Sequence, residues 1–335
     1  MNLPDYNFLS APLWLVTVLH VLTLTLHFVA MNFLVGGIIV VLFGKFKDKW
    51  NDPTVQTFVK MFPNAMAATV TLGVAPLLFV QLTYHKYIYT AAIVSGWFWL
   101  LVIVMAIVGY YFLYATSFTK KIGNKGAYLA IALLCFLYIS YVYSSVFAMA
   151  ERPDIYTALY ASNQSGWVLN PEIGSYIFRW LHMMLGAVTV GGFFVGWIGK
   201  NNEPAYRIGK QFFLWGMVAA IILGFVYMLT FGDMLKPFMR SIGIWMVTLG
   251  LLLSLGSLHF FFKKKFIPAA LMVFVSLLTM VITRHVVRTL HFEGIFDPGS
   301  IKFAPQWSIF ILFLVCFLIA VGLVWYMLKL FLAKE

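Results

Sequence analysis

Long apolar runs recur along the whole length of this chain. As a helix, each run is long enough to cross the roughly 30 Å hydrocarbon core of a bilayer. No soluble domain needs a composition that is 62% hydrophobic and only 10% charged over 335 residues. The pattern therefore predicts a single transmembrane domain over 1–335, with no soluble module and with membrane lipid around it.

We predict nine transmembrane helices, which make the chain an all-α integral membrane bundle. The connections alternate in charge, because lysines and arginines gather in every second one while the others carry acids such as Glu151, Glu172 and Asp297. Since Lys-rich loops stay in the cytoplasm, the N-terminus is expected outside and the C-terminus inside a bacterial cytoplasmic (inner) membrane. The expected spans are 11–43, 62–84, 88–117, 126–150, 173–199, 208–232, 240–262, 266–290 and 306–332.

Other sequence signals exclude several classes of protein. The net charge of +12 comes from short loops, so it indicates orientation in the membrane and not a nucleic-acid partner. No small-residue cleavage site follows the first apolar run, which is expected to remain as a span. Cys135 and Cys316 fall inside spans, and the sequence has no C-x-x-C-H motif for covalent c-type haem. We find no internal repeat in the sequence.

The stretch 167–197 combines ionisable and small residues inside one apolar run. Arg179 and His182 lie one helical turn apart, and an ionisable side chain at such depth usually marks a site. Glycines give a helix a bare face that a flat ligand or another helix can approach closely. Histidine for iron and arginine for propionate describe a haem b pocket, whereas the alternative is a histidine that hydrogen-bonds between helices. The glycines are Gly186, Gly191, Gly192 and Gly196.

Six of the seven histidines are expected in the outer half of the membrane or near its midplane, and only His259 lies at the inner end. His20 and His27 lie two turns apart on one helix face, about 10 Å apart in height. A single iron cannot take both, so at least one is expected to be a ligand. His85 lies among tyrosines in TYHKYIY, which also fits an interfacial belt.

The densest polar group of the sequence lies at 284–291 and comprises Arg284, His285, Arg288 and His291. Arginines there suit haem propionates, which need bidentate donors in a low dielectric. The alternative is an interfacial cluster that reaches water or lipid phosphate. Met246 lies at a depth similar to that of His182, and a thioether opposite an imidazole would hold a low-spin haem.

These features together resemble the large, haem-bearing subunit of cytochrome bd-type quinol oxidases. The similarity covers roughly the first 255 residues and is strongest in VLNPEIGSYIFRWLHMMLGAVTVGGFF at 168–194, with further matches in LHFVAMNFLVGG, TLGVAPLLFVQLTY and MVTLG. The resemblance implies nine spans with the N-terminus outside. It also implies that His182 and Met246 ligate a low-spin haem and that His27 ligates a haem of the inner pair.

The chain departs from this family in three places. The span 88–117 has no carboxylate, whereas the oxidases carry paired glutamates there for proton delivery. TRHVVRTLHFEG replaces the region that supplies a carboxylate ligand, and the quinol-binding loop shrinks to about FGDMLKP. Reduction of oxygen needs protons and an open iron, so these departures favour electron transfer over oxygen reduction.

The sequence therefore predicts a bd-like membrane cytochrome b, a quinol-linked oxidoreductase subunit of a hetero-oligomer. It is expected to exchange electrons between the membrane quinone (quinol) pool and an outer-side redox partner such as a multihaem c-type cytochrome. Two alternatives are a quinol-dependent oxygen reductase and a haem-free anchor of a periplasmic enzyme. Two or three b-type haems are expected, with His182 and Met246 on one, His27 or His20 with His285 or His291 on another, His85 as a further ligand, and Arg179, Arg284 and Arg288 on propionates.

Overall fold

The computed structural model describes residues 8–304 and 306–332, and these fall into two compact units. One unit comprises 19–296, and the other comprises the described parts of 1–18 and 297–335. The prediction of one domain over 1–335 stays a prediction.

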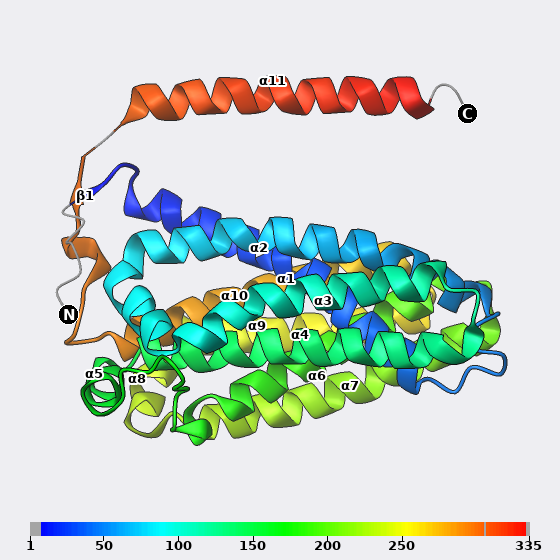
Figure 1. Cartoon of the computed structure of the whole chain (residues 1–335), viewed down its shortest axis with the longest axis horizontal. Helices are drawn as coiled ribbons and strands as arrows, with labels where there is room; N and C mark the ends of the chain where they lie inside the picture. Colours follow the sequence, from blue (N-terminus) through cyan, green and yellow to red (C-terminus); the bar gives the residue numbers. More distant parts are fainter. Residues whose placement is uncertain (1–7, 305, 333–335) are drawn as a thin grey trace. The chain divides into compact units, whose positions relative to one another are not determined.

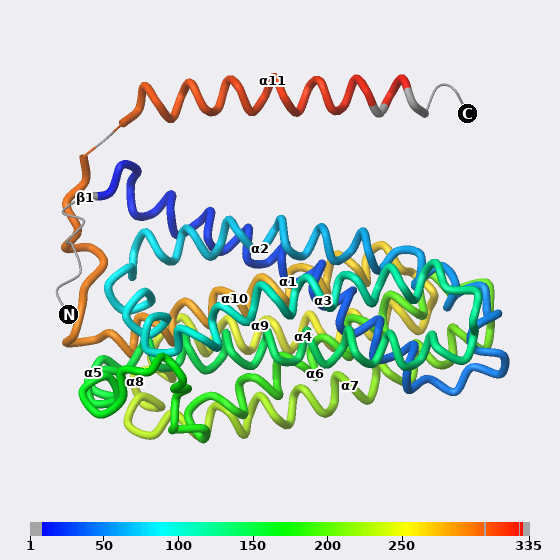
Figure 2. Tube along the Cα trace, in the orientation of Figure 1, coloured from blue at the N-terminus to red at the C-terminus, as the bar shows by residue number. Residues whose placement is uncertain are grey.

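The unit of residues 19–296 is a bundle of long helices that run along one common direction (Figure 1). Two short helices, α5 (Pro153–Ser162) and α8 (Leu235–Arg240), lie at one end of it (Figure 1). Figure 2 shows the same path as a Cα trace. The long helices are α1 (Leu13–Phe43, which starts in the other unit), α2 (Pro53–Val94), α3 (Gly96–Phe118), α4 (Ile122–Ala150), α6 (Ile177–Ile198), α7 (Glu203–Leu229), α9 (Ile242–Phe262) and α10 (Phe266–His291).

The other unit joins the two ends of the described chain. Strand β1 (Phe8–Leu9) pairs in parallel with β2 (Lys302–Phe303). The amide of Ala304 extends the pairing by donating to Leu9 O at 2.9 Å. The last helix, α11 (Trp307–Leu332), follows β2.

Within the described residues, nine helices are long and apolar enough to cross a membrane, and the protein is a multi-pass membrane protein. The prediction of an all-α chain with nine long apolar helices is thus confirmed, while the orientation of its termini stays a prediction. Successive long helices reverse direction (Figure 1). The connections after α1, α3, α6 and α9 therefore share one end, which we call the lysine end, and the opposite one is the α5 end.

The connection expected at 84–88 does not exist, because α2 runs on to Val94 and only Ser95 separates it from α3. The break is reduced to one residue, Tyr84, whose φ of −117° and ψ of 31° are not helical. Polar residues in TYHKYIY suggested a loop, yet the backbone is helical on both sides of Tyr84. A kink in an otherwise continuous helix is the result.

Helices α1 and α6 approach each other through glycine. A Cβ added at Gly36 would lie 1.8 Å from the carbonyl oxygen of Ala187, and one added at Gly191 would lie 2.2 Å from the carbonyl carbon of Gly36. Such distances leave no room for any side chain, so the two backbones are in direct contact. This contact fixes the position of α6, and with it His182, relative to α1.

Candidate functional site

Two of the predicted ligands, His27 in α1 and His182 in α6, share one arrangement. Nδ1 of His182 lies 2.8 Å from the carbonyl oxygen of Ala220 in α7, and Nδ1 of His27 lies 2.9 Å from that of Thr69 in α2. A carbonyl oxygen only accepts, so Nδ1 carries the proton in both rings. Nε2 is left with its lone pair, which is the form of imidazole that binds a metal.

Glycine holds each of these rings against the neighbouring helix. A Cβ at Gly224 would lie 3.0 Å from Cε1 of His182, and a Cβ at Gly73 would lie 2.9 Å from Cε1 of His27. Each glycine lies one turn after the accepting carbonyl, so the helix offers both a hydrogen bond and a bare surface to the ring. The imidazole is thereby fixed in orientation, as metal-binding histidines are by their hydrogen-bond partners.

The structure uses both nitrogens of His20. Its Nδ1 lies 3.0 Å from the carbonyl oxygen of Pro76, and Nη1 of Arg288 donates to its Nε2 at 3.4 Å. The side chain is buried, with 6% of its residue surface exposed. Of the pair that the sequence left open, only His27 therefore has an Nε2 without a hydrogen bond among the described residues.

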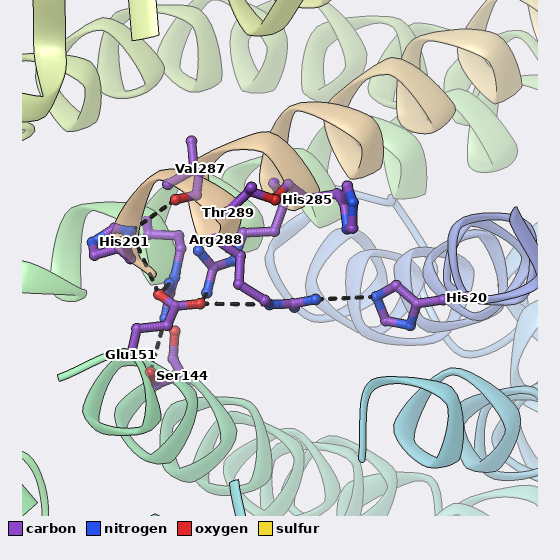
Figure 3. Close-up of polar contacts among 10 residues, drawn as sticks. His20, Ser144, Glu151, His285, Val287, Arg288, Thr289 and His291 are labelled. Atoms are coloured by element: carbon purple, nitrogen blue, oxygen red, sulfur yellow. Dashed lines mark hydrogen bonds and ion pairs between the residues drawn. The ribbon is translucent and has the colours of Figure 1, made fainter. Parts of the chain in front are cut away.

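The predicted arginines lie around a buried carboxylate, Glu151, at the α5 end (Figure 3). Arg284 Nη2 contacts its Oε1, to which Nε of Arg288 lies at 3.6 Å. Nη1 of Arg179 and Nδ1 of His291 lie 3.8 and 3.9 Å from Oε2. Arg288 extends between Glu151 and His20 in Figure 3. We call these five residues, without His20, the Glu151 cluster.

The cluster carries more positive than negative charge. Burial alone would raise the pKa of Glu151, but Arg284 above all, and then the other members, lower it from 4.5 to about 2. The carboxylate is therefore ionised at neutral pH, and three guanidinium groups surround one negative charge. Nη1 of Arg284 is buried and has no hydrogen-bond partner among the described residues. Such a site is complementary to a further anion.

Sequence reasoning missed Glu151, which it treated only as an acid of an outer connection. The arginines were assigned to propionates, and the structure shows that they share this carboxylate as their anionic partner. Arg179 also donates through Nη2 to Ser144 O at 2.9 Å. The available signal was its position, directly after α4 ends at Ala150, at the same end of the bundle as Arg179 and Arg288. Charge pairing between helices far apart in sequence cannot be derived from spacing alone.

The remaining predicted residues lie in separate places. His291 belongs to the Glu151 cluster and also contacts its own helix through Val287 O at 2.9 Å. His285 is partly buried, and in the part of the chain that the structure describes its Nδ1 has no hydrogen-bond partner. Met246 is a partly buried residue of the first turns of α9, and His85 follows the kink residue Tyr84 in α2. His259 is exposed at the lysine end of α9.

Three of the four glycines singled out in α6 pack against helices. Gly191 meets Gly36 of α1, Gly192 meets the backbone of α7 at Phe213, and Gly196 meets the ring of Phe261. Gly186 has open space, because a Cβ added there would meet no described atom within 4 Å. Since Gly186 lies one turn after His182 on the same helix face, room remains beside that histidine.

The described residues contain no group of three or more His, Cys, Asp and Glu side chains that could hold a metal ion. A haem iron takes only one or two ligands from the protein. Comparison with protein-family models, with characterised proteins and with solved structures found no match. Fold and site thus define a multi-pass membrane protein with two fixed intramembrane imidazoles and a buried, positively charged cluster.

Proposed function

We propose that this chain is a bd-oxidase-like membrane cytochrome b that carries electrons between membrane quinone and a redox partner at the outer surface. The observation that supports it most is the shared state of His27 and His182. Both rings give Nδ1–H to a carbonyl of the next helix and keep Nε2 available. Structural histidines that only bridge helices gain nothing from leaving the second nitrogen unused in an apolar environment.

His182 and Met246 are the proposed axial ligands of one haem b, and His27 is the proposed ligand of a second. For the partner of His27, the sequence offered His285 and His291. His291 is engaged with Glu151. His285 is therefore the histidine of α10 that stays available. When bound, the iron would supply one-electron transfer, and two protein ligands would close it to oxygen.

The Glu151 cluster supports binding of a macrocycle that bears carboxylates. Haem b carries two propionates, and the cluster has two positive charges in excess of Glu151. Arg179 lies one helical turn from His182, so the surplus charge is close to the proposed iron ligand in the sequence of α6. Arginines are suited to such pairs because their planar fork matches a carboxylate.

Electron transfer fits this chain better than oxygen reduction. Helix α3 carries no Asp or Glu over Gly96–Phe118, so it offers no carboxylate for proton delivery. The proposed site of exchange with a partner is the α5 end, where the cluster lies and where the positive-inside pattern predicts the outer surface. A multihaem c-type cytochrome is the partner proposed for this surface.

The test is haem content of the full-length chain purified in detergent. A pyridine haemochrome assay is expected to show b-type haem in the wild type and a loss in His182→Ala. His259→Ala, at the exposed lysine end of α9, is the matched control and should keep all haem. A monodisperse wild-type protein with no Soret band would refute the proposal and favour a haem-free anchor.

A second measurement separates electron transfer from oxygen reduction. In proteoliposomes, quinol is expected to reduce the haems while oxygen consumption stays at background. Rapid quinol-dependent oxygen consumption would instead identify an oxygen reductase.

A further inference from the structure

The first helix of the bundle and α6 carry the same pattern at a constant separation. LHFVAMNFLVGGIIVVLFGK at 26–45 and LHMMLGAVTVGGFFVGWIGK at 181–200 share eight of their twenty positions. The same offset relates His27 to His182 and Gly36 to Gly191, since 182 minus 27 equals 191 minus 36. Both helices end at the residue before the matched Gly44 and Gly199.

The second helices, α2 and α7, repeat their contacts with these first helices. The carbonyl and glycine that hold His27 are Thr69 and Gly73, and those that hold His182 are Ala220 and Gly224. One offset relates both pairs, since 220 minus 69 equals 224 minus 73.

Near the lysine end the correspondence of α2 and α7 continues. A Cβ at Gly37 would meet Phe58 and Phe62, and one at its counterpart Gly192 would meet Gly209 and Phe213. Phe58 corresponds to Gly209 and Phe62 to Phe213. Both pairs have the same sequence separation as Gly73 and Gly224. The two second helices therefore keep one register against the first helices over their whole contact.

The third and fourth helices of each set also contact each other through a glycine. A Cβ added at Gly109 of α3 would meet Cys135 and Phe136 of α4. A Cβ added at Gly250 of α9 would meet Thr279 and Met280 of α10. The offset of the glycines (250 minus 109) is smaller by three than that of their partners (280 minus 136). The connections 119–121 and 263–265 are equally long, so the three additional residues lie in α9 between Gly250 and Phe262.

The two sets meet through equivalent residues. Gly36 and Gly191 are counterparts and touch each other, as counterparts do on the axis of a two-fold interface. Near the lysine end Asn202, the residue before α7, donates to Asp52, the residue before α2, at 2.9 Å. This pair is one residue out of the register that relates the rest of α2 to α7. Helices α1–α4 are therefore one copy of a four-helix unit, and α6, α7, α9 and α10 are the second. The sequence analysis found no repeat, because each helix is related to its counterpart by a different offset.

The repeat assigns a counterpart to Met246. The offset that relates Gly109 to Gly250 also relates Met105 of α3 to Met246 of α9. Each methionine lies one turn before its glycine. Both glycines pack on the fourth helix of their copy, so both methionines lie on the same helix face at the same depth. Both side chains are partly buried.

We propose that each copy holds one b-type haem by the same axial pair, His27 with Met105 in the first and His182 with Met246 in the second. This inference rests on the proposed function and replaces His285 as the partner of His27. The counterpart of His285 in the first copy is Tyr141, so the fourth helix has no repeated ligand. A thioether and an imidazole are a known low-spin ligand pair for haem.

The experiment measures haem per chain and spin state in the purified full-length chain. We expect two haems in the wild type, one in His27→Ala and a different one in His182→Ala. Met105→Leu and Met246→Leu preserve side-chain size and should each convert one low-spin haem to high spin in electron paramagnetic resonance. Met61→Leu, at an exposed position of α2, is the control and should leave both signals unchanged.

Each other outcome has a defined meaning. One haem in the wild type, lost only in His182→Ala, overturns the repeated pair while the proposed function stands. A spectrum altered by His285→Ala and unaffected by Met105→Leu overturns the assignment of Met105. A wild type without haem overturns both the pair and the proposed function.

Discussion

The two copies of the four-helix unit hold their histidines alike but differ in charge. His27 and His182 each contact a carbonyl and a glycine of the next helix. Only the second copy carries the three arginines, since the counterparts of Arg179, Arg284 and Arg288 are Leu24, Ser140 and Ser144. Their carboxylate partner, Glu151, follows α4 of the first copy. The backbone contacts of the site have been kept in both copies, whereas its electrostatics have been changed in one.

The largest expected effect comes from the shared contact between the copies. Gly36→Val and Gly191→Val each place a branched side chain where the other helix's backbone lies. We expect each to destabilise the fold by about 4 kcal/mol or more, the range of severe core defects. Thermal unfolding in detergent measures this, and Gly123→Ala, where an added Cβ meets no described atom within 4 Å, is the control. Unequal effects of the two substitutions would argue against an equivalent role.

The second-largest effect concerns Glu151, the buried carboxylate around which the arginines of the second copy lie. Glu151→Gln leaves three buried guanidinium groups without their carboxylate, and removal of one partner from a buried pair costs about 3–5 kcal/mol. Asp154→Asn breaks an exposed pair with Arg152 and should cost at most about 1 kcal/mol. Equal unfolding temperatures for the two variants would contradict the role given to Glu151.

The same carboxylate makes stability depend on pH in a defined window. Because folding lowers the pKa of Glu151 from 4.5 to about 2, its contribution is fully present above 4.5 and is lost as pH falls from there toward 2. Unfolding temperature measured against pH should show this loss in the wild type. In Glu151→Gln the decline over this interval should be smaller, and an unchanged profile would refute the assignment.

A smaller effect tests whether the two imidazoles are held alike. Gly73→Ala and Gly224→Ala each bring a methyl group about 3 Å from a ring carbon, and the ring must shift by a few tenths of an ångström. Each variant should alter the low-spin spectrum of one haem and keep haem content at two per chain. If both variants perturbed the same haem, the copies would not be independent sites.

The smallest expected effect is a shift in the midpoint potential of one haem when Arg179 loses its charge. Arg179→Gln removes one positive charge near His182 and should lower the midpoint potential of the haem that His182→Ala loses. At an assumed separation of about 10–15 Å and an effective dielectric of about 20, the shift is roughly 50–70 mV. Leu24→Gln, at the counterpart position, should leave that potential unchanged in a spectroscopic redox titration.

The sequence predicted the membrane class and the histidine-bearing helices, because hydropathy and the cost of buried ionisable groups are local properties. It named six of the seven histidines as candidate ligands, His27 and His182 among them, and the structure shows these two in the same hydrogen-bonded state. It could not supply the carbonyls that orient them, since Thr69 and Ala220 are distant in sequence and only packing brings them near.

Other features were hidden for different reasons. The kink at Tyr84 looked like a loop, because a polar segment at a membrane surface has the composition of either. Glu151 looked like a surface acid, because its three arginines come from α6 and α10. Met105 could be recognised only after the offset of each helix was known from contacts.

The glycine contact between α1 and α6 bears on the history of the gene. A four-helix ancestor with one such glycine would have paired with a second copy of itself by bringing those glycines together. Duplication and fusion of such a homodimer would give one polypeptide in which each half can mutate alone. The acquisition of arginines by a single half is the asymmetry that such a fusion permits and a homodimer forbids.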